Sequence, residues 1–279
     1  MQFCQCFFAF CSNFAPTVNN ANTIDRTEKL VKLEDMLQRK GIKRKIISAI
    51  IIVSLLFSFA SPVFPEVHIS SSATLVSRYI WRGFDTVPNN KPTLQPSVTL
   101  RLGESGLCFT LWSAFALVDT NFVELDFIMG YDKAISKDFS LCTGVGYFTF
   151  PSHPHYPDKN STSPEIYLGT TFDFIPFSPG LTAYYDFNLG DGLYATLGLQ
   201  KSFPLLGKVL CSNFLLGYTT QYQNIWVEPG FSDLCFRLST DFVFKGLTLT
   251  PSLNYVIVPY ETINKEDEIW GGLSINYDF

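Results

Sequence analysis

The chain has 279 residues, of which 47% are hydrophobic, 16% are aromatic and only 16% are charged, and its net charge is -5. Many aromatic and few charged residues exclude an intrinsically disordered chain. No basic excess is present to neutralise phosphates, so we expect no nucleic acid among the partners. This composition favours a membrane protein.

The first 60 residues carry an export signal. A basic cluster over 39–45 precedes the apolar run Ile46–Ala60, which is shorter than the roughly 20 residues that cross a bilayer as a helix. Ser58 and Ala60 are small residues where a signal peptidase would cut, as is typical of a secretory signal peptide. We predict an unstructured or mis-annotated extension over 1–35, a signal peptide over 36–60 that starts at Met36, and a β-barrel over 61–279. A single membrane anchor is the alternative to the signal peptide.

The remainder of the chain predicts twelve strands. Apolar and polar residues alternate with period two, which is the pattern of a strand with one face buried or in lipid. Most segments are 9 to 14 residues long, long enough for a tilted strand to cross a bilayer. The alternation fails at Leu215 and Trp270, which fall on the polar side. The expected strands are 67–81, 93–102, 106–118, 122–132, 138–150, 164–174, 180–188, 192–201, 208–221, 232–243, 246–258 and 268–279.

These strands predict an all-β fold, a transmembrane antiparallel up-and-down barrel of about twelve strands. A soluble β-sandwich also alternates, but here short turns alternate with longer loops, as in outer-membrane barrels. An open sheet edge is not tolerated in lipid, so the sheet must close. Aromatic residues near strand ends are expected to form interfacial girdles: Tyr79, Trp81, Tyr131, Tyr147, Tyr218, Tyr255 and Tyr260.

The C-terminal strand indicates the bacterial outer membrane as the location. Leu273, Ile275, Tyr277 and Phe279 share one face, and the chain ends on Phe. This pattern is similar to the terminal strand by which outer-membrane proteins are recognised for assembly. We therefore predict Ile275, Tyr277 and Phe279 as an assembly signal, with the barrel-assembly machinery and outer-membrane lipid as partners.

Several short segments resemble the TorF family of porins. They are Ser77–Gly83, Gln95–Ser97, Glu124–Tyr131 and Glu165–Gly169. The resemblance covers most of 67–279. It implies an outer-membrane barrel with a channel role, and it implies no substrate and no catalytic residues.

The alternation predicts which polar residues face the lumen. Charged rings inside a pore set its ion selectivity, and a twelve-stranded barrel lies between the filled eight-stranded barrels and the open porins. We therefore predict a narrow porin-like channel for small solutes that prefers cations or neutral solutes. The alternative is a non-conducting barrel with a structural or surface-binding role that acts through its outer loops. The predicted lumen residues are Arg78, Arg82, Gln95, Arg101, Glu124, Asp126, Glu165, Asp173, Asp233 and Arg237, and Asp186 and Asp241 share their phase.

We expect no enzyme, no cofactor and no metal site. His68 lies at the start of the first strand, and His153 and His155 lie in the longest predicted loop near Asp158. A His-x-His-x-x-Asp cluster could bind a metal, but its prolines favour a solvated loop. The four cysteines of 61–279 fall in four different strands. Free thiols are therefore favoured over a disulfide, which export would allow. These are Cys108, Cys142, Cys211 and Cys235.

Overall fold

The computed structural model describes residues 66–87, 89, 91–118, 121–151, 161–205, 207–220 and 229–279. The predicted extension and signal peptide, His153, His155 and the loop over 222–228 lie outside the described residues. Among the described residues, no helix is long and apolar enough to cross a membrane.

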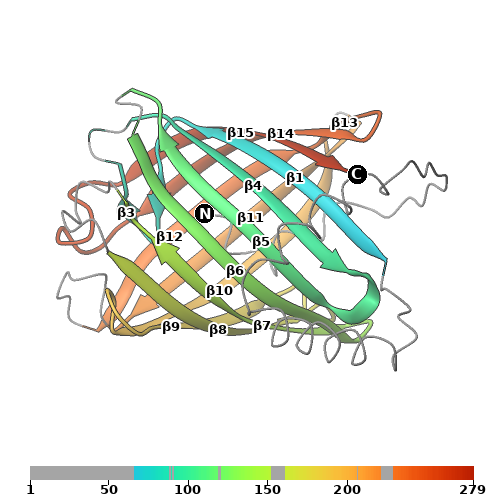
Figure 1. Ribbon diagram of the computed structural model, residues 1–279, viewed down its shortest axis with the longest axis horizontal. Coiled ribbons are helices and arrows are strands. Elements are labelled where there is room, and N and C mark those ends of the chain that lie inside the picture. The colour runs from blue at the N-terminus through green and yellow to red at the C-terminus, as the bar shows by residue number, and fades with distance from the viewer. Residues whose placement is uncertain are drawn as a thin grey trace, which may run out of the picture. The chain divides into compact units, whose positions relative to one another are not determined.

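The chain folds into a closed antiparallel barrel of twelve strands (Figure 1). Each strand pairs with its sequence neighbour in the wall, and β1 pairs with β15 to complete the ring. The wall strands are β1 (Val67–Val76), β4 (Thr93–Leu102), β5 (Leu107–Ala116), β6 (Asn121–Ser136), β7 (Phe139–Thr149), β8 (Thr162–Phe172), β9 (Gly180–Asp186), β10 (Gly192–Leu205), β11 (Lys208–Thr219), β12 (Gly230–Thr240), β14 (Leu247–Ile257) and β15 (Glu268–Asp278).

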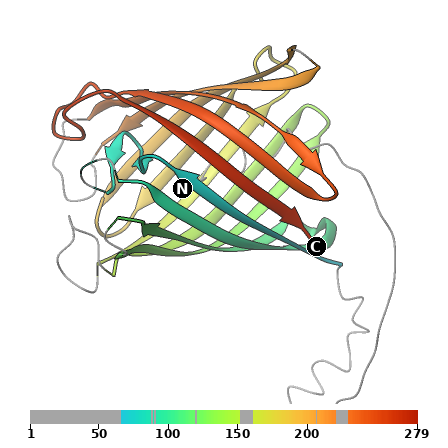
Figure 2. The same cartoon turned by 90° about the horizontal axis from the view of Figure 1, so that it is seen from above.

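Three short strands and one helical turn complete the described structure. β13 (Phe242–Phe244) follows β12 after an interruption at Asp241 and pairs with the start of β14. A 3-10 helix over Gly103–Ser105 connects β4 to β5. β2 (Ile80–Trp81) and β3 (Phe84–Asp85) form a separate small sheet. Figure 2 shows this small sheet at the end of the barrel opposite the C-terminus.

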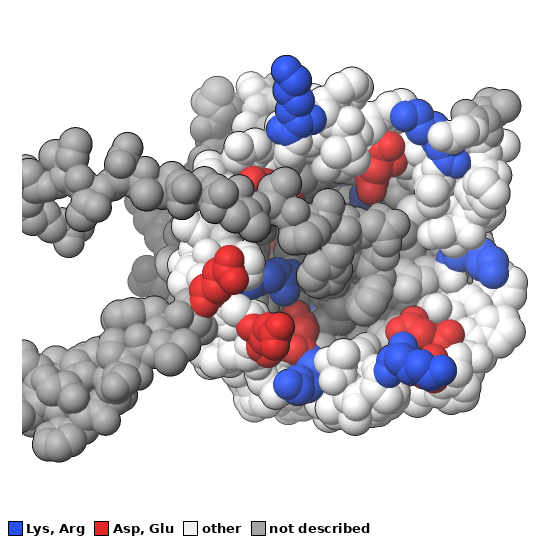
Figure 3. All heavy atoms as spheres, turned by 90° about the vertical axis from the view of Figure 1, so that its right-hand side faces the viewer, with Lys and Arg blue, Asp and Glu red and all other residues white. Residues whose placement is uncertain are grey.

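The alternation of the sequence matches the two faces of the wall. On β15 the side chains of Ile269, Leu273 and Ile275 are exposed on the outside, whereas Glu268 and Ser274 are buried inside. Exposed large apolar residues recur in this way on the other wall strands. The outer face is therefore apolar, while the rim at the C-terminal end carries interspersed basic and acidic residues (Figure 3). This arrangement suits a barrel surrounded by lipid.

The predicted strand set is confirmed with one correction of consequence. The first strand was expected to continue to Trp81, but β1 ends at Val76. There the Ser77 N–H donates to the Gly271 carbonyl at 2.9 Å, and the chain then leaves the wall. Tyr79, only 2% exposed, packs against Trp112 with 5.8 Å between ring centroids.

The aromatic girdle prediction is therefore wrong for part of its members. Tyr79 and Trp81 lie inside the barrel, and Tyr260 packs against an inner apolar cluster. The remaining four tyrosines are exposed, as expected: Tyr131, Tyr147, Tyr218 and Tyr255.

The cysteines that the structure describes carry free thiols. Cys108, Cys142 and Cys211 are buried, and Cys235 is half-buried on the inner side. These side chains act as small packing residues.

Candidate functional site

The segment after β1 folds into the lumen as a hairpin. Trp81 and Phe84 are paired, and the two residues between them, Arg82 and Gly83, have φ angles of 50° and 81°. Two consecutive positive φ angles match the two-residue turn favoured in tight hairpins, in which glycine is at home. A Cβ on Gly83 would lie 3.1 Å from the Asp233 Cβ and 3.2 Å from a Val258 methyl carbon. The tip of this inward hairpin (residues 79–87) therefore lies tightly against the barrel wall.

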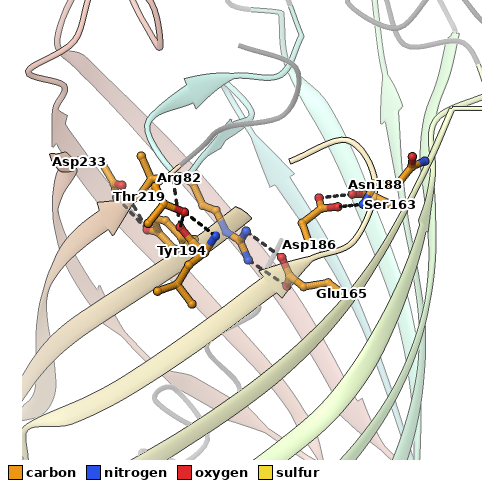
Figure 4. A network of polar contacts seen from close by, with 10 residues as sticks. Arg82, Ser163, Glu165, Asp186, Asn188, Tyr194, Thr219 and Asp233 are labelled. Carbon is orange, nitrogen blue, oxygen red and sulfur yellow. Dashed lines mark hydrogen bonds and ion pairs between the residues drawn. The ribbon is translucent and has the colours of Figure 1, made fainter. Parts of the chain in front are cut away.

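Arg82 fixes the hairpin tip to the wall. Its two terminal nitrogens lie 2.8 Å and 3.0 Å from the two carboxylate oxygens of Glu165 on β8 (Figure 4). Such a bidentate pair is among the stronger polar contacts in proteins. The guanidinium carbon also lies 4.5 Å, 4.7 Å and 4.4 Å from the ring centroids of Trp81, Tyr184 and Tyr194. Because these cation–π contacts are desolvated, they add to the attraction that holds Arg82.

Apolar contacts hold the hairpin on two sides. On one side Tyr79 and Val87 pack with Trp112 and other residues of β5 and β6. On the other side Phe84 packs with Val256 and its neighbours around the end of β14. Trp81 and Trp270 contact both clusters. The hairpin is thus a packed part of the fold, and it narrows the lumen.

A ring of carboxylates surrounds the hairpin. Every one of them is 5% exposed or less and lies within six residues of the strand end on the hairpin side of the barrel. They come from β6, β8, β9, β12 and β15. The carboxylate ring consists of Glu124, Asp126, Glu165, Asp186, Asp233 and Glu268.

Hydroxyl groups and two arginines partly satisfy this ring. The Tyr79 hydroxyl donates to Glu124 at 2.8 Å, and the Tyr194 hydroxyl lies 3.2 Å from both oxygens of Asp233. Ser163 donates to Asp186. Arg78 pairs with Glu268, as Arg82 does with Glu165.

The carboxylates outnumber these two arginines by four. Glu165 and Asp186 are directly opposite in the sheet register, an arrangement of like charges that is unfavourable without such partners. Asp126 is fully buried on β6, two residues from Glu124 on the same side of the strand. The constriction is therefore acidic.

The structure brings six of the ten predicted lumen residues to the constriction. Arg78 and Arg82 lie on the inward segment, and Glu124, Asp126, Glu165 and Asp233 lie on the wall around it. The other four lie elsewhere: Gln95, Arg101, Asp173 and Arg237.

Those four residues have different surroundings. Gln95 and Arg237 line the cavity that adjoins the hairpin, described below. Arg101 pairs with Asp132 at 3.6 Å near the opposite end, and both side chains are partly exposed. Asp173 is in the turn after β8 rather than on a strand, and its N–H donates to the Asp138 carbonyl. Asp173 therefore lies just outside the strand on which it was expected, since β8 ends at Phe172.

Reasoning from the sequence missed several members of the site. Glu268 opens β15, where too few strand residues precede it to show its phase. Tyr184 and Tyr194 face inward and cover Arg82, and no role was predicted for either of them. The pair Arg82-Gly83 was a usable signal, since an x-Gly pair between apolar residues favours a tight hairpin.

A cavity of about 190 Å³ adjoins the hairpin inside the barrel. Trp81, Trp112 and Trp270 supply aromatic walls. Polar side chains face it from β1, β4, β11, β12 and β14: Ser72, Thr74, Gln95, Asn213, Arg237 and Asn254. The cavity could hold a small polar molecule, but the described residues contain no group of three His, Cys, Asp or Glu side chains placed to hold a metal ion.

An inward-facing acidic constriction in a lipid-facing barrel defines a membrane barrel with a restricted lumen. The model of a bacterial protein family of unknown function, Gcw_chp, matches residues 60–257. The chain belongs to this family. No curated protein matches the chain.

The fold resembles that of solved outer-membrane barrels. The KdgM porin in complex with disordered oligogalacturonate has 10% identity and a TM-score of 0.47, with 76% of this chain and 99% of that chain covered. The NanC porin has 9% identity and a TM-score of 0.46, with 77% and 100% covered. LpxR from Salmonella typhimurium has 13% identity and a TM-score of 0.45, with 75% and 100% covered.

Proposed function

We propose that this protein is an outer-membrane channel that passes small solutes through a narrow lumen and prefers cations or neutral solutes to anions. The observation that carries the proposal is the carboxylate ring around the inward hairpin. Six buried carboxylates face two arginines at this level. A ring of acidic side chains at the narrowest part of a pore attracts cations and repels anions.

The dimensions of the barrel agree with a narrow path. Barrels of eight strands are filled by side chains, whereas those of 16 to 18 strands leave an aqueous channel. Twelve strands lie between these cases, and here the hairpin occupies part of the lumen. Only small solutes would fit past it.

The outer-membrane location is part of the same proposal. It is supported by the apolar outer face and by the last strand, where Ile275, Tyr277 and Phe279 are exposed on one side. These three residues would be read by the barrel-assembly machinery after export through the signal peptide over 36–60. The resemblance to the TorF family of porins supports the same role.

We also propose that the protein is not an enzyme. The only histidine in the described residues is His68, which is exposed at the start of β1, at the end opposite the carboxylate ring. The side-chain partners of the ring carboxylates include tyrosine, serine and arginine. Among the described residues, no histidine lies next to these hydroxyl groups, and a histidine base is the common activator of a serine nucleophile.

A second candidate is a non-conducting barrel with a structural or surface-binding role. The observation that favours it is the apolar packing on both sides of the hairpin. If these clusters never separate, the lumen stays closed to ions. Function would then reside in the loops at the hairpin end.

Conductance in a planar bilayer separates the two candidates. The protein is purified from membranes of an expressing bacterium and inserted singly. Discrete current steps, with a reversal potential displaced toward that of the cation in a salt gradient, are expected of the channel. A folded, inserted barrel that gives no current overturns the channel and supports the second candidate.

A further inference from the structure

A lysine interrupts the apolar outer face of β10. Outward residues on this strand include Leu197 and Phe203, which are 36% and 38% exposed, and Lys201 lies between them on the same side. Lys201 is exposed. A charged side chain on the lipid face is costly unless it reaches the interface or meets a partner of opposite charge. Its position therefore needs a physical reason.

Lys201 is next to a second polar group. The sheet register places it directly opposite Ser212 on β11, so a lysine and a serine are neighbours in the same outer groove. Together they offer hydrogen-bond donors to one anionic oxygen group. This pair lies toward the end of the barrel that carries the C-terminus, because β10 runs from the hairpin end toward that end.

The pair lies in an aromatic groove of about 530 Å³. Phe214 on β11 and Phe236 on β12 are in edge contact, with 5.1 Å between their ring centroids. Phe203 extends the groove along β10, and Phe203 and Phe236 are both exposed. An aromatic groove with a cationic side chain in it matches the shape and charge of a lipid that has a phosphate head group and acyl chains.

The turn between β8 and β9 closes one side of the groove. Phe177 in this turn has a φ of 70°, which is uncommon for a bulky residue. Its carbonyl accepts a hydrogen bond from the Gln200 N–H at 2.7 Å. The Lys201 ammonium lies 5.8 Å from the centroid of the Phe177 ring. The turn is thereby fixed over β10, and its aromatic ring flanks the lysine.

We infer that this outer groove (Phe177, Lys201, Phe203, Ser212, Phe214 and Phe236) binds one phospholipid. The phosphate contacts Lys201 and Ser212, and one acyl chain lies along Phe203, Phe214 and Phe236. The inference rests on the proposed membrane location. It is independent of whether the lumen conducts.

The chain offers a matched control for the lysine. Lys133 is also exposed and lies on β6 between the exposed residues Tyr131 and Ile135. It is near the same end of the barrel, but it does not line the groove. A lysine that only extends its amine to the interface would behave alike at both positions.

Native mass spectrometry of the detergent-purified protein, titrated with dioleoyl phosphatidylglycerol, tests the site. Wild type and Lys133→Met are expected to bind one lipid with dissociation constants within about twofold of each other. Lys201→Met is expected to bind about tenfold more weakly, because a charge-assisted hydrogen bond is lost. Ser212→Ala, which removes only a hydroxyl group, and Phe236→Ala are each expected to weaken lipid binding. Folding of each variant is checked by heat-dependent mobility in gels.

Two further experiments define the ligand. Glycerol 3-phosphate in 100-fold excess is expected to leave the lipid bound, because it lacks acyl chains. Displacement by it, or equal affinity of the Lys201→Met and Lys133→Met variants, would overturn the inference. Failure of the protein to insert into liposomes overturns the membrane location and this site together. Insertion without a retained lipid overturns this site alone.

Discussion

Replacing Arg82 by alanine should release the inward hairpin and enlarge the proposed channel. The Arg82 and Glu165 side chains are 9% and 2% exposed, so solvent screens their interaction little. Removing one partner of such a buried pair typically costs 3–5 kcal/mol, because the remaining charge is unpaired. Since about 1.4 kcal/mol corresponds to a tenfold change, the hairpin-out state should gain about two to three and a half orders of magnitude in relative population. The lost contacts with Tyr184 and Tyr194 act in the same direction.

Single-channel recording measures this effect directly. The Arg82→Ala variant is expected to show larger current steps than wild type and stronger cation selectivity, because Glu165 becomes an uncompensated negative charge in the lumen. Arg101→Ala is the matched control. Its pair with Asp132 is longer, at 3.6 Å, and partly exposed. Exposed ion pairs contribute little to stability, so Arg101→Ala is expected to give current steps of wild-type size.

The double variant Arg82→Ala, Glu165→Ala gives an internal check. It removes both charges, so no unpaired carboxylate is left to favour the hairpin-out state; its barrel should be more stable and its current steps closer to those of wild type than is the case for Arg82→Ala alone. A folded Arg82→Ala barrel with wild-type conductance and selectivity would refute the reasoning. It would mean that the apolar clusters alone determine the position of the hairpin.

Three other changes test the ring, the outer face and the turn. The double variant Glu124→Gln, Asp126→Asn should shift the reversal potential toward that of the anion. An unchanged reversal potential would mean that these residues do not line the ion path. Leu273→Arg puts a charge on the lipid face at mid-strand and should cost roughly 2–4 kcal/mol, seen as a loss of folding yield; a normal yield would contradict the outward assignment. Gly83→Ala should lower the unfolding temperature more than Gly207→Ala. Both glycines have positive φ, but only Gly83 has neighbours within 4 Å of an added Cβ; equal losses would argue against tight packing at the hairpin tip.

The wall of the barrel could be predicted from the sequence because one physical rule determines it. Each wall residue faces either the apolar outside or the lumen, so polarity alternates along the strand with period two. The β4 segment, expected at 93–102, is observed at those bounds. The shared face of Leu273 and Ile275 was recovered in the same way.

The inward hairpin could not be predicted from that rule. Tyr79 and Trp81 continue the apolar phase of β1, so the alternation alone makes them lipid-facing. What differs is the environment inside the barrel, which becomes apolar where the hairpin packs against Trp112 and Val256. Alternation cannot reveal this, because it depends on contacts between strands that are far apart in the sequence.

The two exceptions to the alternation nevertheless pointed to the hairpin. Leu215 and Trp270 fall on the lumen side, and both line the cavity next to the hairpin. An apolar side chain that faces water in the lumen gains no hydrophobic stabilisation. It therefore needs an apolar partner that removes it from water there. The wall is already complete with twelve strands, so this partner must come from a connecting segment. The segment after β1 supplies the aromatic residues and the Arg-Gly turn that fill this role. Apolar residues in the lumen phase of a barrel sequence therefore predict an inward-folded segment opposite them, and in this chain they lie beside the inward hairpin.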